Sequence, residues 1–467
     1  MSNKSLARWQ RLGRTLLLAL AGFMFGALWT TPVHASAEYS LQTGVSWYRF
    51  SNPFQYPDGV SSPLNTNGSA WSDDLRGALF LPLPTERSSL QVTGMVSQMR
   101  YNAPYNNYTD QLSTSGSYNL DRPIKQIEAT YNWEFSDLLR GSVTHRIDDR
   151  LFSYLGGEIV PNIDSVPPNV SNVEPEYPHI REDTVEVAYR VNNHLDLPLT
   201  WVEQTLSYTL PGRAELLNMN SNALQAAVRY NASTNSNFQF GVRRNKVNFP
   251  GRTASDISQY DSGYTDTEYF SDIDWLVTSD TLLKVHFGRV SRQFDTLTAN
   301  NSTLPSTEVG MIWNFSPKTT FITRLWHHPQ PNDEADNFLY VMSRGTETIA
   351  TWQPTPKTRL SATASVELDS TQGFPGSNAG NVLTNGTDRT KRLSLRYDYN
   401  MTRNLNLRID ATREVTDTNP GTPATYHGNM LRISLSYSFD NLGGTVDRTN
   451  PLGFNRAHQQ IETMRSE

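Results

Sequence analysis

The stretch "TDTEYFSDID" (265–274) places acidic residues at alternating positions. These acids are Asp266, Glu268, Asp272 and Asp274. Residues two apart share one face of a β-strand, so this face would be strongly acidic. It could bind a cation or a sugar inside a channel. Alternatively, Arg243 before it and Lys284 after it neutralise the acids, because opposite charges on neighbouring strands stabilise a sheet. We favour neutralisation.

Histidines are the other candidates for chemistry: His145, His286 and the pair within "WHHPQ" (326–330). His327 and His328 are adjacent, so on a strand they point to opposite faces and cannot share one metal or one proton relay. None of these histidines lies in a nucleophile motif. The sequence also shows no metal-binding cluster, phosphate loop or nucleotide motif. We therefore predict that the protein is not an enzyme and uses no metal or cofactor.

Many further charges occupy the polar positions of alternating segments. They are expected to face water, because an Arg or Lys facing lipid at the bilayer midplane costs about 2–4 kcal/mol. The main candidates for lining an aqueous lumen are Arg229, Arg243, Asp266, Glu268, Asp272, Asp274, Lys284, Arg324, Arg359, Arg396 and Arg408. Arg140, Arg190, Arg392 and Glu203 belong to the same pattern. The arginines could bind acidic or hydroxylated sugars through forked hydrogen bonds, or each could pair with an acid on a neighbouring strand.

The elements that would position these residues are β-strands. "LRISLSYSF" (431–439) alternates strictly between apolar and polar residues, which is the period of a strand with one apolar face. Segments 38–50, 223–230 and 392–399 show the same pattern. Alternating runs of this kind recur about 18 times along the chain.

The connections between these runs alternate between short and long. Turns such as 136–139 and 316–319 are very short, whereas 153–179 and 370–388 are long and rich in Gly, Pro, Asn and Ser. This asymmetry is typical of outer-membrane barrels, with short periplasmic turns and long extracellular loops. Lipid cannot satisfy unpaired backbone groups, so the sheet must close. We predict an all-β, antiparallel up-and-down transmembrane barrel with both chain ends on the periplasmic side.

Aromatic residues indicate which face contacts lipid. Trp, Tyr and Phe gather where strands enter the short turns, as the membrane interface requires. In the final strand, Leu435, Tyr437 and Phe439 resemble the assembly signal of outer-membrane proteins, in which alternating apolar residues end on an aromatic. A polar segment (440–467), which we expect to be a periplasmic tail, follows this strand.

The N-terminus predicts export. Four basic residues precede the apolar run 15–29 and the small residues of "VHASA", so residues 1–37 are expected to form a cleavable signal peptide. The barrel would occupy 38–439. Without the signal the net charge is about −10, four units more negative than the −6 of the whole chain, which excludes nucleic acid as a partner. The chain has no Cys, and hence no disulfide. We expect it in the outer membrane of a Gram-negative bacterium, with membrane lipid and the outer-membrane assembly machinery as partners.

A resemblance to a known family covers the middle of the chain. The stretches "GVRRNKVNFPGR" (241–252), "YTDTEYFSDIDW" (264–275), "LKVHFGRVSRQFD" (283–295) and "TEVGMIWNFSPKTTFITRLW" (307–326) are similar to the EpsL-type outer-membrane barrels of exosortase-associated exopolysaccharide operons. The resemblance implies a role in secreting or assembling an extracellular polysaccharide, with that polymer as transported ligand and periplasmic export proteins as partners.

Three functions therefore stay open from sequence. The first is a passive pore that exports exopolysaccharide, the second is a general diffusion porin for small solutes, and the third is a scaffold barrel that holds synthesis partners through its loops or tail.

Overall fold

The computed structural model describes residues 37–51, 67–83, 87–101, 122–149, 158–160, 174–176, 179–208, 211–233, 236–330, 338–373, 386–418 and 424–440. The predicted signal peptide, apart from residue 37, and the tail from 441 onward lie outside these ranges. Among the described residues, no helix is long and apolar enough to cross a membrane.

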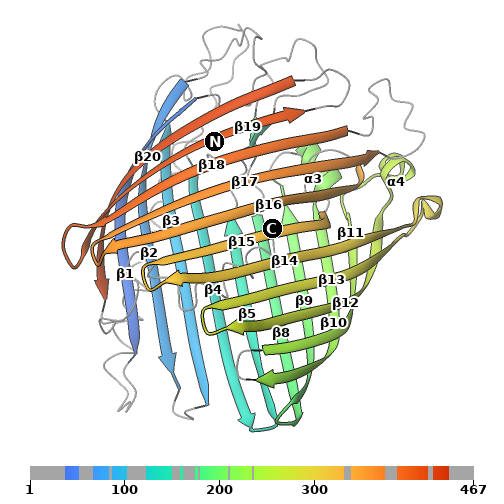
Figure 1. Cartoon of the computed structure of the whole chain (residues 1–467). Helices are drawn as coiled ribbons and strands as arrows, with labels where there is room; N and C mark the ends of the chain where they lie inside the picture. Colours follow the sequence, from blue (N-terminus) through green and yellow to red (C-terminus); the bar gives the residue numbers. More distant parts are fainter. Residues whose placement is uncertain are drawn as a thin grey trace, which may run out of the picture.

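Eighteen antiparallel strands form one sheet that closes on itself, because the first strand pairs with both the second and the last. Figure 1 shows the blue N-terminal strands meeting the red C-terminal ones where the barrel closes. The strands are β1 (Glu38–Ser51), β2 (Asn67–Pro82), β3 (Ser88–Tyr101), β4 (Arg122–Ser136), β5 (Leu139–Asp149), β8 (His179–Asn192), β9 (Leu195–Ser207), β10 (Met219–Ser233), β11 (Ser236–Asn248), β12 (Gly263–Thr278), β13 (Thr281–Phe294), β14 (Ser302–Ser316), β15 (Thr319–Gln330), β16 (Phe338–Thr355), β17 (Thr358–Gly373), β18 (Gly386–Asn400), β19 (Leu405–Thr418) and β20 (Ala424–Asp440). The predicted fold class and strand number are confirmed.

The two ends of the barrel differ as the turn lengths predicted. Seven hairpins, from β4–β5 to β18–β19, have connections of only two to four residues at the periplasmic end. The extracellular connections carry the small pair β6 (Glu158–Val160) and β7 (Glu174–Glu176), α3 (Pro211–Leu217), α4 (Ala254–Tyr260) and a 3-10 turn (Thr298–Asn300). The sequence did not predict these helices. Nor did it predict that β16 begins at Phe338, because the alternation of "FLYVMS" was missed.

The outer surface of the barrel is apolar and meets the membrane. Large hydrophobic side chains exposed on it include Val45, Leu199, Leu224, Phe240, Phe287 and Leu395. Beside the tight turns the exposed residues are aromatic, among them Phe135, Trp275, Phe315, Trp352 and Phe439. Neighbouring rings pack together, with centroids 4.7 Å apart for Tyr437 and Phe439. An apolar band with an aromatic girdle on a barrel without edges identifies an outer-membrane protein.

The opposite phase of every strand faces the lumen, and its side chains contact one another across strands. Arg432 of β20 reaches Asp74 of β2 at 3.7 Å, past the intervening β1. Ser46 and Ser434 share a hydrogen bond of 2.8 Å on the same inner face. Side chains two strands apart can meet only on the concave side of a curved sheet, so these contacts place the polar phase inside.

An apolar cluster interrupts the polar interior near the extracellular rim. Leu206, Met219, Val247, Tyr264 and Phe294 pack there with Leu217 of α3. Strand alternation alone gave no reason to expect buried apolar side chains inside the barrel. Strands β8 to β13, strand β16 and the helical connections supply the cluster, so it packs these connections against the barrel wall.

Arg252 anchors the connection that contains α4. Its guanidinium donates to the backbone oxygens of Leu216, Tyr260 and Asp261 and lies 3.7 Å from the Phe249 ring centroid. Burial lowers the pKa of Arg252 to about 10, although Asp261 opposes this shift. Asp261 has a left-handed backbone (φ 71°), and its carboxylate accepts from the Thr296 amide at 2.9 Å. This connection is therefore built as a fixed part of the barrel mouth.

Candidate functional site

The structure places all eleven main lumen candidates on the inner phase of their strands. Arg229 contacts Gln239, Arg243 contacts Gln225, and Arg359 lies opposite Asp398. Glu203, which belonged to the same sequence pattern, faces outward on β9 beside Trp201 and Asn222. That placement from sequence was wrong. Glu203 lies near the extracellular rim, where the outer surface has left the hydrocarbon and polarity no longer distinguishes the two faces.

Each acid of the 265–274 stretch has a basic partner. Arg243 lies 3.5 Å from Glu268, and Lys284 lies 3.7 Å from Asp274, as the neutralisation hypothesis predicts. The other two acids have partners that the sequence analysis did not name. Arg292 donates two hydrogen bonds, of 2.9 and 2.8 Å, to the Asp266 carboxylate. His286 contacts Asp272 at 2.6 Å.

His286 is held between two carboxylates. Its Nδ1 lies 2.6 Å from Asp272, its Nε2 lies 3.0 Å from Glu268, and Ser306 approaches Nε2 at 3.2 Å. Phe270 stacks on the ring at a centroid distance of 6.0 Å. The two acids occupy opposite edges of the imidazole, so they do not converge on a common point. Accordingly, no group of three or more His, Asp or Glu side chains suited to a metal ion occurs among the described residues. The arrangement orients charges within the wall.

The other histidines do not join this group. His328 lies on the inner phase of β15, whereas His327 points outward, opposite Arg344. His145 also faces outward, where it contacts Asp183. The prediction that the adjacent pair His327 and His328 points to opposite faces is confirmed.

A ladder of ion pairs joins β18 and β19 on the inner face. Arg392 pairs with Glu414 at 2.7 Å, Arg396 with Asp410 at 2.6 Å, and Arg408 with Asp398 at 2.7 Å. The Arg392 and Arg396 side chains are 45% and 48% exposed, but their partners Glu414 and Asp410 are only 9% and 11% exposed. The carboxylates therefore lie against the wall, and the guanidinium groups face the lumen water.

The same arrangement, an exposed arginine paired with a buried carboxylate, occurs on the opposite side of the barrel. Asp196 of β9 is fully buried, and Arg140, which contacts it at 2.7 Å, is 42% exposed. Arg190 and Asn231 also point to this carboxylate. Because β9 and β18 lie half the barrel apart in strand order, opposite walls both present guanidinium groups to the lumen.

In a third sector, β13 to β16, the arginines are less exposed than their acid partners. Arg292 is only 2% exposed and donates to the Leu339 backbone oxygen of β16 as well as to Asp266. Arg324 is only 11% exposed beside Glu308 and stacks over Trp326 at 4.9 Å. Trp326 in turn donates to Ser343 at 2.9 Å. This sector forms a closed polar wall, so the exposed guanidinium groups described above lie on the other two walls.

The sequence analysis did not name Arg292, Asp196, Glu414 or Asp74 among the inner residues. Arg292 and Glu414 follow the same alternation as the named candidates, and counting positions from Lys284 and Arg408 reaches them. Asp196 stands at the second position of its strand, immediately after a tight turn, where alternation is too short to assign a face.

No protein-family model and no curated protein sequence matches the chain. Several solved outer-membrane proteins are similar in structure. OccK1 (OpdK) of Pseudomonas aeruginosa is 12% identical with a TM-score of 0.44, and the match covers 87% of this chain and 99% of that one. OpdQ of the same organism is 10% identical, with a TM-score of 0.46 and coverage of 87% and 98%. OccAB3 of Acinetobacter baumannii is 10% identical, with a TM-score of 0.45 and coverage of 87% and 99%. At these identities the likeness concerns the barrel fold alone.

Proposed function

We propose that the protein is a passive channel that lets small anionic or hydroxylated solutes diffuse across the outer membrane. The observation that carries this proposal is the order of the ion pairs on two opposite walls, where guanidinium groups face the water and their carboxylates lie in the wall. A solute in the lumen therefore meets hydrogen-bond donors and positive charge before it meets the acids.

This arrangement suits passage better than tight capture. A guanidinium fork offers paired donors to a carboxylate, phosphate or sugar hydroxyl and so replaces part of the hydration that the solute loses. Each fork already has a carboxylate partner, so its attraction for a solute is partly cancelled. Weak binding at several sites allows a solute to enter and also to leave.

Ion selectivity in a planar bilayer tests the proposal. With a KCl gradient across the membrane, we expect a reversal potential that indicates chloride preference. The double variant Arg392→Gln, Arg396→Gln should shift it toward potassium, because Glu414 and Asp410 lose their partners. Arg389→Gln, on the outward phase of the same strand, is the matched control and should leave selectivity unchanged. Potassium preference in the unmodified protein, or no shift in the double variant, would contradict the proposal.

Exopolysaccharide export is a second candidate, supported by hydroxyl pairs beside the same ladder. Ser394 and Thr412 lie 3.0 Å apart, and Thr390 and Thr416 lie 3.2 Å apart, on the inner faces of β18 and β19. Such rows can bind sugar hydroxyls, in keeping with the family resemblance of the sequence. A strain without the protein separates the two candidates. Loss of surface polysaccharide with normal small-solute uptake supports export, whereas reduced uptake with unchanged polysaccharide supports the diffusion channel.

A further inference from the structure

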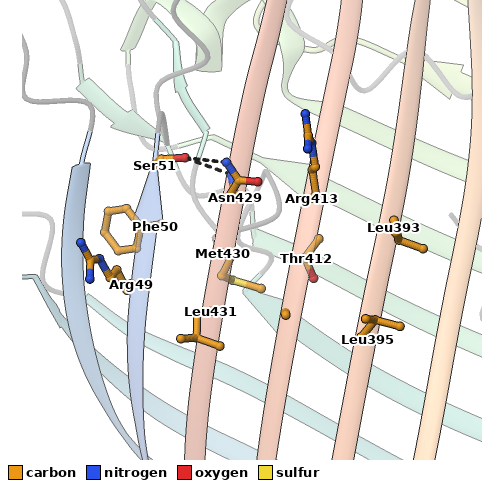
Figure 2. A pocket seen from close by; sticks show the side chains of 11 residues that line it. Arg49, Phe50, Ser51, Leu393, Leu395, Thr412, Arg413, Asn429, Met430 and Leu431 are labelled. Atoms are coloured by element: carbon orange, nitrogen blue, oxygen red, sulfur yellow. Dashed lines mark hydrogen bonds between the residues drawn. The ribbon is translucent and has the colours of Figure 1, made fainter.

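A groove of about 420 Å³ lies on the outer face of the barrel across β18, β19, β20 and β1. Figure 2 shows how these four neighbouring strands contribute side chains to it. Strand register sets two of its rows. One row is Arg49, Leu431, Ala411 and Leu395, and the next row toward the extracellular end is Ser51, Asn429, Arg413 and Leu393.

The groove exists because Ala411 is small where its neighbours are large. Leu395 on one side and Leu431 on the other rise past it, so its short side chain leaves a furrow with an apolar floor. Leu393 extends this apolar wall and is 51% exposed. A furrow of this kind on the membrane face is filled by lipid, since nothing else of comparable hydrophobicity reaches it.

One arginine stands on either side of the groove, with Arg413 in the row nearer the extracellular end and Arg49 in the row below it. Arg413 rises from its upper edge, and Arg49 stands on the far side of Asn429 (Figure 2). Both arginines are exposed, and neither has an ion-pair or hydrogen-bond partner among the described residues. Asn429 lies between them and is held by two hydrogen bonds of 3.2 Å to Ser51. These two arginines therefore differ from the inner Arg140, Arg392 and Arg396, which have carboxylate partners.

The groove continues toward the periplasm along the same strands. A second hollow of about 380 Å³ is lined by Val45, Trp47, Trp71, Ile433 and Leu435. Its first row, with Trp47 and Ile433, comes directly after the row of Arg49 and Leu431. Same-face residues are about 6.8 Å apart along a strand, so the path from Asn429 to Leu435 spans roughly 20 Å. That length matches an acyl chain running down one leaflet from a headgroup at the arginines.

We infer that this groove is a binding site for an outer-leaflet lipid whose phosphate groups give its headgroup a net negative charge. Its acyl chain would lie over Ala411 between Leu395 and Leu431, and its phosphate would contact Arg413 and Arg49. Arginine suits this role because its planar fork binds phosphate through paired hydrogen bonds. Basic residues are attracted to an anionic membrane surface, and here the groove restricts that attraction to one place.

Native mass spectrometry of the full-length protein tests the inference. The protein is purified in detergent and titrated with diphosphorylated lipid A, with the same lipid A after enzymatic removal of its phosphates, and with phosphatidylcholine. We expect one tightly retained molecule of the phosphorylated lipid and at least tenfold weaker retention of the other two.

Three variants locate the site. Arg49→Ala, Arg413→Ala should abolish the tightly retained lipid by removing both phosphate ligands. Ala411→Leu should do the same by filling the furrow without changing charge. The matched control is Arg244→Ala, Lys246→Ala, which removes two outward cations of β11 that line neither groove. This control should retain the lipid as the unmodified protein does. Migration on unheated gels verifies that each barrel is folded.

Each outcome of this experiment either supports the proposed lipid site or contradicts it. Equal retention by the double arginine variant, or equal loss in the β11 control, would show that the lipid binds non-specifically around the barrel and would overturn the inference. Equal retention of the dephosphorylated lipid would overturn the role of the arginines. If Ala411→Leu fails to fold, the comparison between the two double variants still decides. None of these results depends on conduction, so the proposed channel function and this site can fail independently.

Discussion

Replacing Arg292 with Ala should be among the most destabilising single changes in this barrel. The Arg292 side chain is 2% exposed, grips Asp266 through hydrogen bonds of 2.9 and 2.8 Å, donates to the Leu339 oxygen at 3.3 Å and stacks 3.9 Å from the Tyr264 ring centroid. Its removal leaves the Asp266 carboxylate without a partner and opens a space beside Tyr264. Breaking a buried pair in this way costs about 3–5 kcal/mol of unfolding free energy.

Reversible urea unfolding in detergent micelles, followed by tryptophan fluorescence, measures this cost. The control is Arg181→Ala, because Arg181 is 66% exposed and its pair with Asp183 is on the outer surface. That change should cost about 0–1 kcal/mol. The double variant Arg292→Ala, Asp266→Asn should recover most of the loss, because no unpaired charge remains. The reasoning is refuted if Arg292→Ala costs no more than Arg181→Ala, or if Asp266→Asn recovers nothing.

Two further predictions concern assembly and acid sensitivity. Phe439→Ala should sharply lower the amount of protein in outer-membrane fractions on immunoblots, because it removes the terminal aromatic of the last strand. The control Phe240→Ala, at a comparably exposed outward position, should not lower it. Equal effects of the two variants would remove any special role for Phe439. The Asp256 pKa is lowered by hydrogen bonds from the Thr253 side chain and backbone, so the capping box of α4 contributes stability above about pH 3.9 that is lost as the pH falls further. The hydrogen-exchange protection factors of residues 254–260, which correct for the pH dependence of the intrinsic exchange rate, should therefore fall on acidification, and Thr253→Ala should remove this dependence; an unchanged acid response in that variant would contradict the assignment.

The architecture could be predicted from sequence because it rests on local patterns. A period of two in segments such as 431–439 sets both the strand and its lipid face, and the difference in length between 316–319 and 370–388 distinguishes the two ends of the barrel. Aromatic residues such as Phe135 and Phe315 mark the interface independently. These signals need no knowledge of which strands pair.

The contacts within the wall could not be predicted in the same way. The bond from Arg292 to Leu339 joins β13 to β16 across two intervening strands, and it depends on the curvature of the closed barrel. The apolar cluster at the rim likewise depends on how α3 lies against strand ends. Near the rim, the polarity of a residue also no longer indicates whether its side chain points outward or into the lumen, as Glu203 demonstrates.

The arginines show why residue type alone does not assign function in this barrel. Arg396 and Arg413 stand on neighbouring strands and are both exposed, yet one faces the lumen and the other faces lipid. Their partners distinguish them. Arg396 rests on Asp410, a carboxylate buried in the wall, so its charge is partly cancelled, which suits a surface that solutes must leave again. Arg413 has no such partner among the described residues and stands above an apolar furrow, so its full charge is available to an anion held there by its acyl chain. A carboxylate introduced beside Arg413, as in Asn429→Asp, should therefore weaken lipid retention while leaving ion selectivity unchanged.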